Sequence, residues 1–348
     1  MANIIDDFST MTQLDSFRMI DQIVKLPDHL REALAWRTSI EGKFEAVLFG
    51  GMGGSAVGGD VLADYASSAS EVHVSVIRGT ELPRWADKKF LIALVSYSGD
   101  TWEVLELFHR AKERGCSMVS ITSGGELKRL SEKEAVPTIP LPPGLQPRAA
   151  LGYLLGAQVA VLEAIGLHSI KKDMAMAQLA MADLRENLSP GVPTHANMAK
   201  RLATKLYQRI PVIYAPRSLR AVAYRWQTQI NENAKMMAFS GDFPEMNHNQ
   251  IVGWMEGSKG TALLPVFLKP ATTKGSMGER MDLTMRLMEE SGVRSIPVEL
   301  SGRTPLESAL MGIMLGDFVS YYLAMLKGVD PTPVVPIQKL KARMAGLS

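Results

Sequence analysis

Two short loops rich in glycine and hydroxyl side chains constrain the fold of this chain more than any other feature. Residues 51–60 read Gly-Met-Gly-Gly-Ser-Ala-Val-Gly-Gly-Asp, and residues 96–101 read Ser-Tyr-Ser-Gly-Asp-Thr. Each loop directly follows an apolar run and leads into a helix-like stretch, which is the order strand, tight turn, helix. Strands connected in this way are parallel, so both loops are expected at the carboxyl edge of one sheet.

The composition of these loops predicts a phosphate site. Glycine lets the backbone approach an anion closely, while hydroxyl groups and the free N–H groups of a helix N-terminus donate hydrogen bonds to it. The glycine loop is not a Walker loop, and Ala56 stands where the dinucleotide fingerprint needs its last glycine. Either loop alone is equally compatible with a tight packing turn. Together they favour a small phosphorylated ligand.

Apolar runs and helical patterns alternate along both halves of the chain. Predicted strands of the first half are 44–49, 72–77, 90–95, 117–122 and 138–141, and the helices between and after them are 56–65, 102–114, 126–133 and 149–165. A second set follows the Pro- and Gly-containing segment 189–193, with strands 211–214, 261–268 and 295–298 and helices 219–234, 278–291 and 305–327. Continuous apolar strands are typical of a parallel sheet that is covered on both faces.

We therefore expect two doubly wound α/β domains, each an αβα sandwich around a parallel sheet. The expected division is an N-terminal helical segment 1–40, a first domain 41–168, a helical connection and linker 169–194, and a second domain with a C-terminal helical tail 195–348. The second domain carries no loop like the two described above, so only the first is expected to bind phosphate.

The composition is that of an ordinary globular protein and excludes several classes of function. Of the 348 residues, 46% are apolar, and the net charge of +2 without a long basic run gives no support for nucleic-acid binding. Cys116 is the one cysteine, which excludes an internal disulfide and fits the reducing cytoplasm, where we expect the protein. Residues 1–18 lack the pattern of a signal peptide, and we expect no apolar stretch to be long enough to span a bilayer. The longest, 309–326, contains Gly316 and Asp317 and is predicted to be a buried helix.

Two charged residues stand in segments that packing alone does not explain. Arg148 comes just before a predicted helix, where a guanidinium group can bind phosphate or enediolate oxygens with two hydrogen bonds. Glu232 lies within Asn-Glu-Asn-Ala-Lys at the end of an amphipathic helix. A carboxylate there opposes the helix dipole and becomes more basic, which makes Glu232 a candidate general base. Taken singly, each is also compatible with an exposed charge at a helix end.

His248 and the C-terminal tail complete the set of candidates. His248 lies in a polar loop between Asn247 and Asn249, whose amides are placed to fix the tautomer of its ring. Residues 336–341 read Pro-Ile-Gln-Lys-Leu-Lys, which by itself indicates a solvated helix end.

Six motifs occur in one order along the chain: Gly-Met-Gly-Gly-Ser, Ser-Tyr-Ser-Gly-x-Thr, Gln-Pro-Arg-Ala-Ala, Asn-Glu-Asn-Ala-Lys, His-Asn before Gly-Trp, and a terminal Ile-x-x-Leu-Lys. In this order they resemble the bifunctional phosphoglucose/phosphomannose isomerases, which are built of two sugar isomerase (SIS) domains. The resemblance spans about residues 46–341. It implies an enzyme that interconverts glucose 6-phosphate and mannose 6-phosphate with fructose 6-phosphate through an enediolate, without a metal or other cofactor.

The resemblance also implies a role for each motif. Arg148 would stabilise the enediolate, Glu232 would move the proton between C1 and C2, and His248 and Lys341 would assist ring opening. The family forms homodimers with the active site at the interface, so His248 is expected to serve the partner's site. The residues implied to lie against the sugar and its phosphate are Gly53, Gly54, Ser55, Ser96, Ser98 and Thr101.

Some positions depart from the family pattern. Asp100 stands where relatives carry asparagine, and an anionic side chain beside a phosphate repels it unless the side chain points away or meets a cation. Trp102 stands where an acidic residue is usual, and Val334, seven residues before Lys341, stands where relatives can carry threonine. The resemblance therefore supports the glucose activity more strongly than the mannose activity. Only the Ile-x-x-Leu-Lys register selects Lys341 over Lys339.

Two alternatives are a non-catalytic phosphosugar sensor and an isomerase of another sugar phosphate, such as a pentose phosphate or an amino sugar phosphate. The first usually includes a DNA-binding module, and no helix-turn-helix is evident. The two-domain length and the Asn-Glu-Asn-Ala-Lys segment argue against the second.

Overall fold

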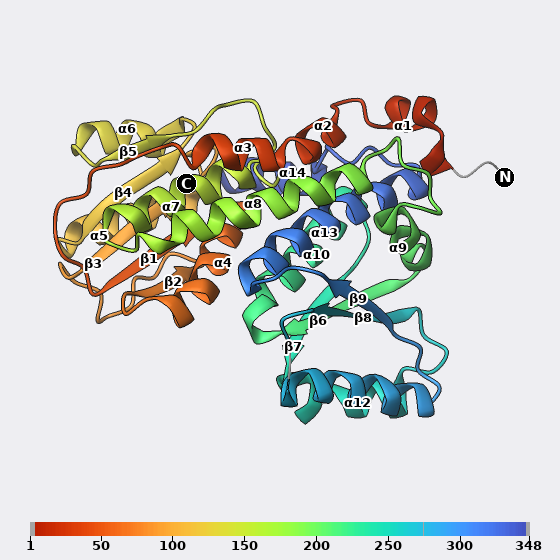
Figure 1. Cartoon of the computed structure of the whole chain (residues 1–348). Helices are drawn as coiled ribbons and strands as arrows, with labels where there is room; N and C mark the ends of the chain where they lie inside the picture. Colours follow the sequence, from red (N-terminus) through yellow and green to blue (C-terminus); the bar gives the residue numbers. More distant parts are fainter. Residues whose placement is uncertain (1–3, 274, 346–348) are drawn as a thin grey trace.

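The computed structural model describes residues 4–273 and 275–345, and it contains two parallel sheets joined by long helices (Figure 1). It confirms the predicted fold class of two doubly wound α/β domains. The outermost residues of the two expected end segments, 1–3 and 346–348, lie outside the described residues.

The first sheet brings the two glycine- and serine-containing loops together. Its order is β2-β1-β3-β4-β5, and every neighbouring pair is parallel. Because β1 and β3 are adjacent and parallel, the loops that follow them open at the same edge of the sheet. The strands are β1 (Ala46–Gly51), β2 (His73–Ile77), β3 (Phe90–Val95), β4 (Ser117–Thr122) and β5 (Thr138–Pro140).

Helices cover both faces of this sheet, which explains its continuous apolar strands. Val47 and Phe49 of β1 share one core with α4 and α7, whereas Leu48, between them, packs on the other face with residues of α5 and α6. These helices are α4 (Gly54–Ala69), α5 (Trp102–Glu113), α6 (Gly125–Lys133) and α7 (Leu151–Ala164).

The N-terminal helices and α8 (Ser169–Leu188) connect the two domains. Helix α3 packs on α7, while α8 packs mainly on α13 of the second domain and also on α3. Figure 1 shows α8 running along the molecule from one domain to the other. The N-terminal elements are η1 (Ile4–Asp6), α1 (Phe8–Leu14), α2 (Met19–Val24) and α3 (Leu26–Ala33), with Pro27 in the first turn of α3.

The second sheet repeats the topology of the first. Its order β7-β6-β8-β9 corresponds to β2-β1-β3-β4, with α10 in the place of α4. The strands are β6 (Ile210–Pro216), β7 (Phe239–Phe243), β8 (Leu263–Pro270) and β9 (Ile296–Leu300). The helical elements are α9 (Met198–Leu206), η2 (Arg217–Leu219), α10 (Arg220–Asn233), η3 (Glu245–His248), α11 (Gln250–Val252), η4 (Gly253–Gly257), α12 (Ser276–Glu290), α13 (Pro305–Lys327) and α14 (Val335–Ala345).

Helix α13 is the buried helix that the sequence predicts. Contrary to the expectation that no stretch is long enough, it has the length and apolarity to cross a membrane, but 89% of its apolar window is buried inside the protein. It packs on α8, α9 and α10, and Thr304 caps its N-terminus by accepting a hydrogen bond from the N–H of Glu307. Its apolar character therefore belongs to the core between the domains.

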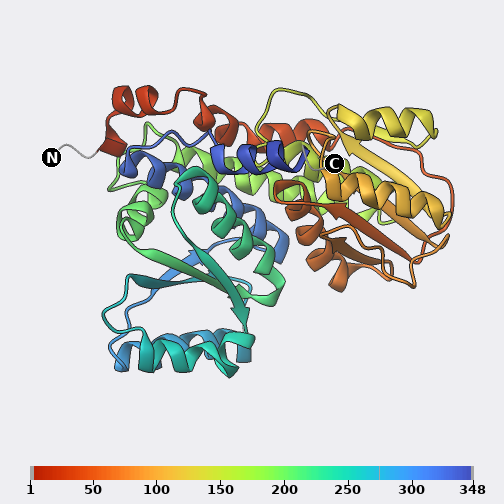
Figure 2. The ribbon, with the colours of Figure 1, turned by 180° about the vertical axis from the view of Figure 1, so that it is seen from behind.

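Several elements were not predicted, among them β7 and α9. Strand β7 reads Phe-Ser-Gly-Asp-Phe and lies at the edge of its sheet, where four of its five residues are exposed or half-buried, so it lacks an apolar run. Helix α9 is short and carries three basic residues, but its apolar face is buried against α13. The tail forms the expected helix, α14, which lies between the two domains in the view from behind (Figure 2).

Candidate active site

The glycine loop forms the start of α4 and packs against the segment that carries Arg148. Gly53 is the N-cap of α4 with φ of +52°, a conformation that favours glycine. A β-carbon on Gly54 would lie 2.9 Å from Cα of Arg148, so only glycine permits this approach. Ser55 is buried, and its hydroxyl accepts a long hydrogen bond of 3.4 Å from the N–H of Tyr97 in the neighbouring loop.

The serine loop is held in shape by its own hydroxyl groups. The hydroxyl groups of Ser96 and Thr101 are 2.8 Å apart, and Ser96 Oγ also accepts a hydrogen bond from the N–H of Gly99 at 3.1 Å. Ser98 is exposed and accepts from the N–H of Asp100. Thr101 is the N-cap of α5, so the free N–H groups of this helix start at the loop. Hydroxyl groups and helix N-terminus together form a cradle suited to a phosphate.

Asp100 points away from this cradle. Its Oδ1 atom accepts a hydrogen bond of 2.9 Å from the N–H of Glu126, in the first turn of α6. Gly99, with φ of +80°, packs closely on the same helix start, where a β-carbon would lie 1.8 Å from the carbonyl oxygen of Gly124. The acidic residue therefore caps α6, and its charge interacts favourably with that helix dipole.

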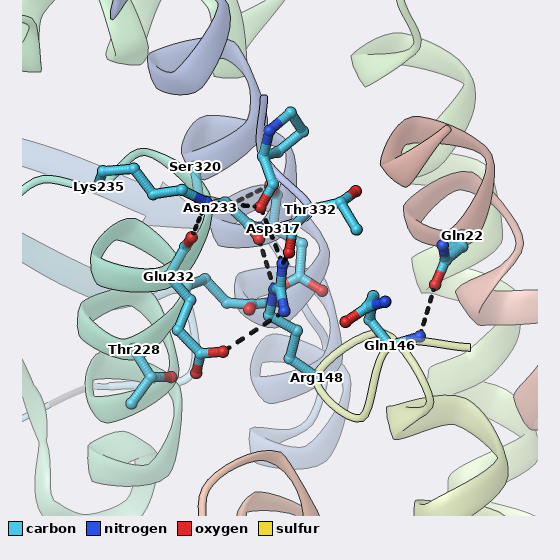
Figure 3. Close-up of polar contacts among 12 residues, drawn as sticks. Gln22, Gln146, Arg148, Thr228, Glu232, Asn233, Lys235, Asp317, Ser320 and Thr332 are labelled. Atoms are coloured by element: carbon cyan, nitrogen blue, oxygen red, sulfur yellow. Dashed lines mark hydrogen bonds and ion pairs between the residues drawn. The ribbon is translucent and has the colours of Figure 1, made fainter. Parts of the chain in front are cut away.

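Arg148 is the centre of the site (Figure 3). Its side chain is only 4% exposed, and its Nε donates to Oδ1 of Asn233 at 2.7 Å. Its Nη2 donates to the carbonyl oxygens of Pro331 and Thr332, both at 2.8 Å. Burial lowers the pKa of Arg148, but a guanidinium group keeps its charge in proteins.

Glu232 faces Arg148 from the last turn of α10. The distance from Arg148 Nη1 to Glu232 Oε2 is 3.5 Å, which is an ion pair and too long for a good hydrogen bond. The carboxylate is 27% exposed, in contrast to the buried guanidinium group. In Figure 3 the two groups point toward each other from different domains. A charge pair that is open on one side can bind a substrate between its members.

A buried network behind Arg148 fixes its position. Arg225 of α10 donates two hydrogen bonds to the carboxylate of Asp317 and one to the carbonyl oxygen of Arg148. Asn233, which accepts from Arg148, donates to Oγ of Ser320, one turn after Asp317 on α13. Arg225 and Asp317 are each 1% exposed. None of these residues was predicted to belong to the site, although a charged residue inside an apolar helix was a signal for Asp317.

The tail begins at the site but its lysines lie outside the contacts that form it. Pro331 and Thr332 are bound by Arg148, and α14 starts three residues later. Lys339 and Lys341 are both exposed on this helix. Positions two residues apart on a helix differ by about 200°, so the two lysines lie on nearly opposite faces and only one can face a given site.

His248 lies at the other end of the second sheet. Strand β7 is parallel to β6, so η3 with His248 follows at the edge where α10 begins, while Glu232 lies in the last turn of that 14-residue helix. The length of such a helix is about 20 Å. His248 is exposed, and the expected amide contacts are not made in the single chain, because Asn247 donates to Thr284 and Asn249 to Glu245.

The N-terminus of α10 in the second domain corresponds to the glycine loop at the N-terminus of α4, but the carboxylate of Asp64 lies against it. Asp64 of α4 faces the first turn of α10, where its Oδ1 atom lies 3.6 Å from Nε of Arg220, and the backbone of Ala221 is close enough to lower its pKa slightly. Burial raises the pKa of Asp64 to about 6. These residues line a cavity of about 910 Å³ between the edge strands β2 and β7. An internal anion thus occupies the helix N-terminus that a phosphate would use.

Comparisons with known proteins identify the family. A bifunctional phosphoglucose/phosphomannose isomerase from Caldicellulosiruptor bescii is 36% identical over 94% of this chain and 99% of its own length. The chain belongs to the bifunctional phosphoglucose/phosphomannose isomerase family. Residues 195–344 match the family of bacterial phospho-glucose isomerase C-terminal SIS domains.

More distant matches agree in fold. A D-glucosamine-6-phosphate 4-epimerase from Sulfolobus acidocaldarius is 29% identical over 64% of this chain and 68% of its own length. A hypothetical protein from Thermus thermophilus, solved by crystallography, superposes with a TM-score of 0.75 and 17% identity, covering 98% of this chain and 94% of its own. The relative from Caldicellulosiruptor bescii thus confirms the sequence-based assignment to the family, and the more distant structure confirms the fold.

Proposed function

We propose that this protein is an aldose–ketose isomerase that interconverts glucose 6-phosphate and mannose 6-phosphate with fructose 6-phosphate. The observation that carries the proposal is the Arg148–Glu232 pair at the start of α4, beside the hydroxyl-rich loop before α5. The family supports it, since a relative that is 36% identical and matched over 99% of its own length carries this name. A cytoplasmic location fits this role and the single, buried Cys116.

In this mechanism the cradle of Ser96, Ser98 and Thr101 binds the phosphate at the N-terminus of α5. The binding energy of a phosphate anchored away from the reaction centre holds C1 and C2 in place. Gly54 packs on Arg148, and Ser55 accepts from the N–H of Tyr97 in the serine loop, so the segment Gly53, Gly54 and Ser55 would contact the sugar hydroxyl groups.

Glu232 and Arg148 would carry out the proton transfer between C1 and C2. Glu232 removes the proton from one of the two carbons and returns it to the other, as a general base and then as an acid. Arg148 donates hydrogen bonds to the oxygens of the enediolate as negative charge develops there. Its burial and its fixed position behind the network of Asn233 make this stabilisation available without reorganisation.

Ring opening would use His248 of the partner and a tail lysine, Lys341. His248 and Glu232 lie at opposite ends of α10, so in one chain they cannot meet at a single sugar. A homodimer that brings His248 to the partner's Glu232 resolves this separation, and its two-fold symmetry would complete both sites at once.

A coupled assay tests the proposal. Purified protein is incubated with fructose 6-phosphate, and glucose 6-phosphate and mannose 6-phosphate are detected separately. Formation of both products is expected, and glucose 6-phosphate alone would restrict the activity to one epimer. Binding without either product would support a sensor. Turnover of an amino sugar phosphate instead would support the second alternative, which the similarity to the 4-epimerase favours.

Complementation tests the interface. Glu232→Gln and His248→Ala each inactivate a homodimer, but a mixed dimer contains one intact site if the two residues come from different subunits. Co-expression in equal amounts should then restore about a quarter of the wild-type activity, because half of the dimers are mixed and each has one good site. No restoration would place both residues in one subunit's site or outside it.

A further inference from the structure

Lys235 occupies an unusual position directly behind the proposed general base. Its Nζ donates hydrogen bonds to the carbonyl oxygen of Glu232 at 2.5 Å and to the carbonyl oxygen of Pro331 at 2.9 Å. Pro331 also accepts from Nη2 of Arg148 at 2.8 Å. Two cations from different segments thus share one carbonyl of the tail, as Figure 3 shows.

This arrangement does not favour a charged lysine. Burial, followed by repulsion from Arg148, lowers the pKa of Lys235 to about 8. The charged groups that face it are Arg148, Glu232, Asp330 and Lys327, and Nζ of Lys327 donates to the carbonyl oxygen of Lys235 itself. Net attraction from the two carboxylates does not offset the loss of water around the ammonium group.

The backbone of Lys235 is also unfavourable for a lysine. It has φ of +53°, just after the last turn of α10, in the position where helices commonly end with glycine. The left-handed conformation brings a β-carbon close to the following carbonyl oxygen, so it is unfavourable for every residue except glycine. A side chain that is costly in both respects, where glycine fits better, is more readily explained by function than by stability.

We propose that Lys235 is a positioning residue of the isomerisation: its ammonium group fixes Pro331 and Thr332 against Arg148 and adds positive charge beside Glu232. This inference rests on the proposed function. The ammonium group acts through two contacts that the structure contains, one to the backbone of the base and one to the tail segment that leads to α14. Both contacts are to backbone carbonyl oxygens, so the ammonium group would act through Glu232 and the tail segment.

Two substitutions separate this role from an ordinary helix-end lysine. Lys235→Gly removes the strain of the left-handed backbone, so the variant should have the wild-type Tm or a higher one. It also removes the hydrogen bonds of the ammonium group, so kcat/KM should fall about tenfold or more. Gln208→Gly is the matched control. Gln208 has φ of +61° in the exposed turn after α9 and takes part in none of the contacts described for the site, so its glycine variant should keep wild-type kinetics.

The pH profile gives a second readout that a structural role would not move. In the wild type, activity should decline as Lys235 loses its proton near pH 8. Lys235→Arg keeps its charge at every accessible pH, so its alkaline limb should move upward by more than one pH unit, whatever its activity at the optimum. Lys235→Gly should lack that limb.

The outcomes separate the two proposals. Wild-type protein that turns over no sugar phosphate refutes the proposed function, whatever the variants do. Active wild type with unchanged kcat/KM in Lys235→Gly, or an unmoved alkaline limb in Lys235→Arg, refutes the role of Lys235 alone. A lower Tm in Lys235→Gly but not in Gln208→Gly would also count against it, because it would assign the lysine to stability.

Discussion

The ion pair of Arg225 and Asp317 gives the sharpest test of how the site is built. Asp317 accepts two hydrogen bonds from Arg225, at 2.9 and 2.6 Å, and a third from Gln229 at 2.9 Å. Arg225 in turn holds the carbonyl oxygen of Arg148 at 3.0 Å. Asp317→Asn keeps the shape of the side chain but leaves the charge of Arg225 buried without a counter-ion.

The size of the effect follows from this burial. Removing one partner of a buried ion pair costs about 3–5 kcal/mol, because the remaining charge stays desolvated. A domain of this size loses about 2–4 °C in Tm per kcal/mol. Asp317→Asn should therefore lower the Tm by roughly 6–20 °C.

A double variant distinguishes the unpaired charge from a general packing defect. In Arg225→Met with Asp317→Leu, both charges are replaced by apolar groups of similar size, which is often neutral for stability. The double variant should thus melt well above Asp317→Asn. It should still lose kcat, since Arg148 no longer has the hydrogen bond from Arg225 that holds its backbone.

Thermal unfolding followed by circular dichroism, with activity measured on the same samples, provides the comparison. A loss of less than about 1 kcal/mol in Asp317→Asn would refute the reasoning, because it would mean that water or another group compensates the charge of Arg225. A double variant with the wild-type kcat would show that the Arg225–Asp317 pair does not position Arg148 for catalysis.

Three further predictions concern other parts of the molecule. Asp100→Ala should lower the free energy of unfolding by about 1 kcal/mol, seen as a lower Tm, because α6 loses its cap. KM for fructose 6-phosphate should change less than about twofold, because the carboxylate faces away from the phosphate cradle. A large fall in KM would show instead that Asp100 repels the phosphate. Ser96→Ala removes two hydrogen bonds that shape the serine loop. In steady-state kinetics it should raise KM roughly tenfold and leave kcat within about threefold of the wild type. An unchanged KM would exclude this loop as the phosphate site. In the folded protein the pKa of Asp64 is raised from 3.8 to about 6, so the folded protein binds this proton more tightly than the unfolded chain does. The free energy of unfolding should therefore fall by roughly 3 kcal/mol as the pH rises from about 4 to 6, and should not recover above that pH. Urea unfolding of Asp64→Asn should lack this pH dependence, and an unchanged dependence in the variant would refute the role of Asp64.

Much of the fold follows from the sequence because local pattern and tertiary burial agree. The strand 117–122 and the helix 305–327 have the predicted bounds, since both are continuous apolar segments that end at clear signals. Strand β7 could not be predicted in the same way, because an edge strand buries only part of its surface and its sequence contains glycine and aspartate.

In the candidate site, the sequence identifies several of the residues but not the contacts between them. Motifs identify Arg148 and Glu232, but their 3.5 Å approach depends on how two domains pack, which no local pattern encodes. The same holds for Asp317 and Lys235, whose partners are 92 and 96 positions away in the chain. The orientation of Asp100 depends on the neighbouring helix α6, so its charge alone suggested a conflict that the structure does not contain.

Exchange of the substrate proton with solvent tests the central claim most directly. Fructose 6-phosphate is converted in D₂O by the wild type and by Glu232→Gln, and deuterium at C2 of the aldose product is measured by NMR. An enediolate formed by a carboxylate base should give deuterated glucose 6-phosphate with the wild type, and Glu232→Gln should incorporate it about 10²–10⁴-fold more slowly. Incorporation at the wild-type rate by Glu232→Gln would contradict the assignment of the base.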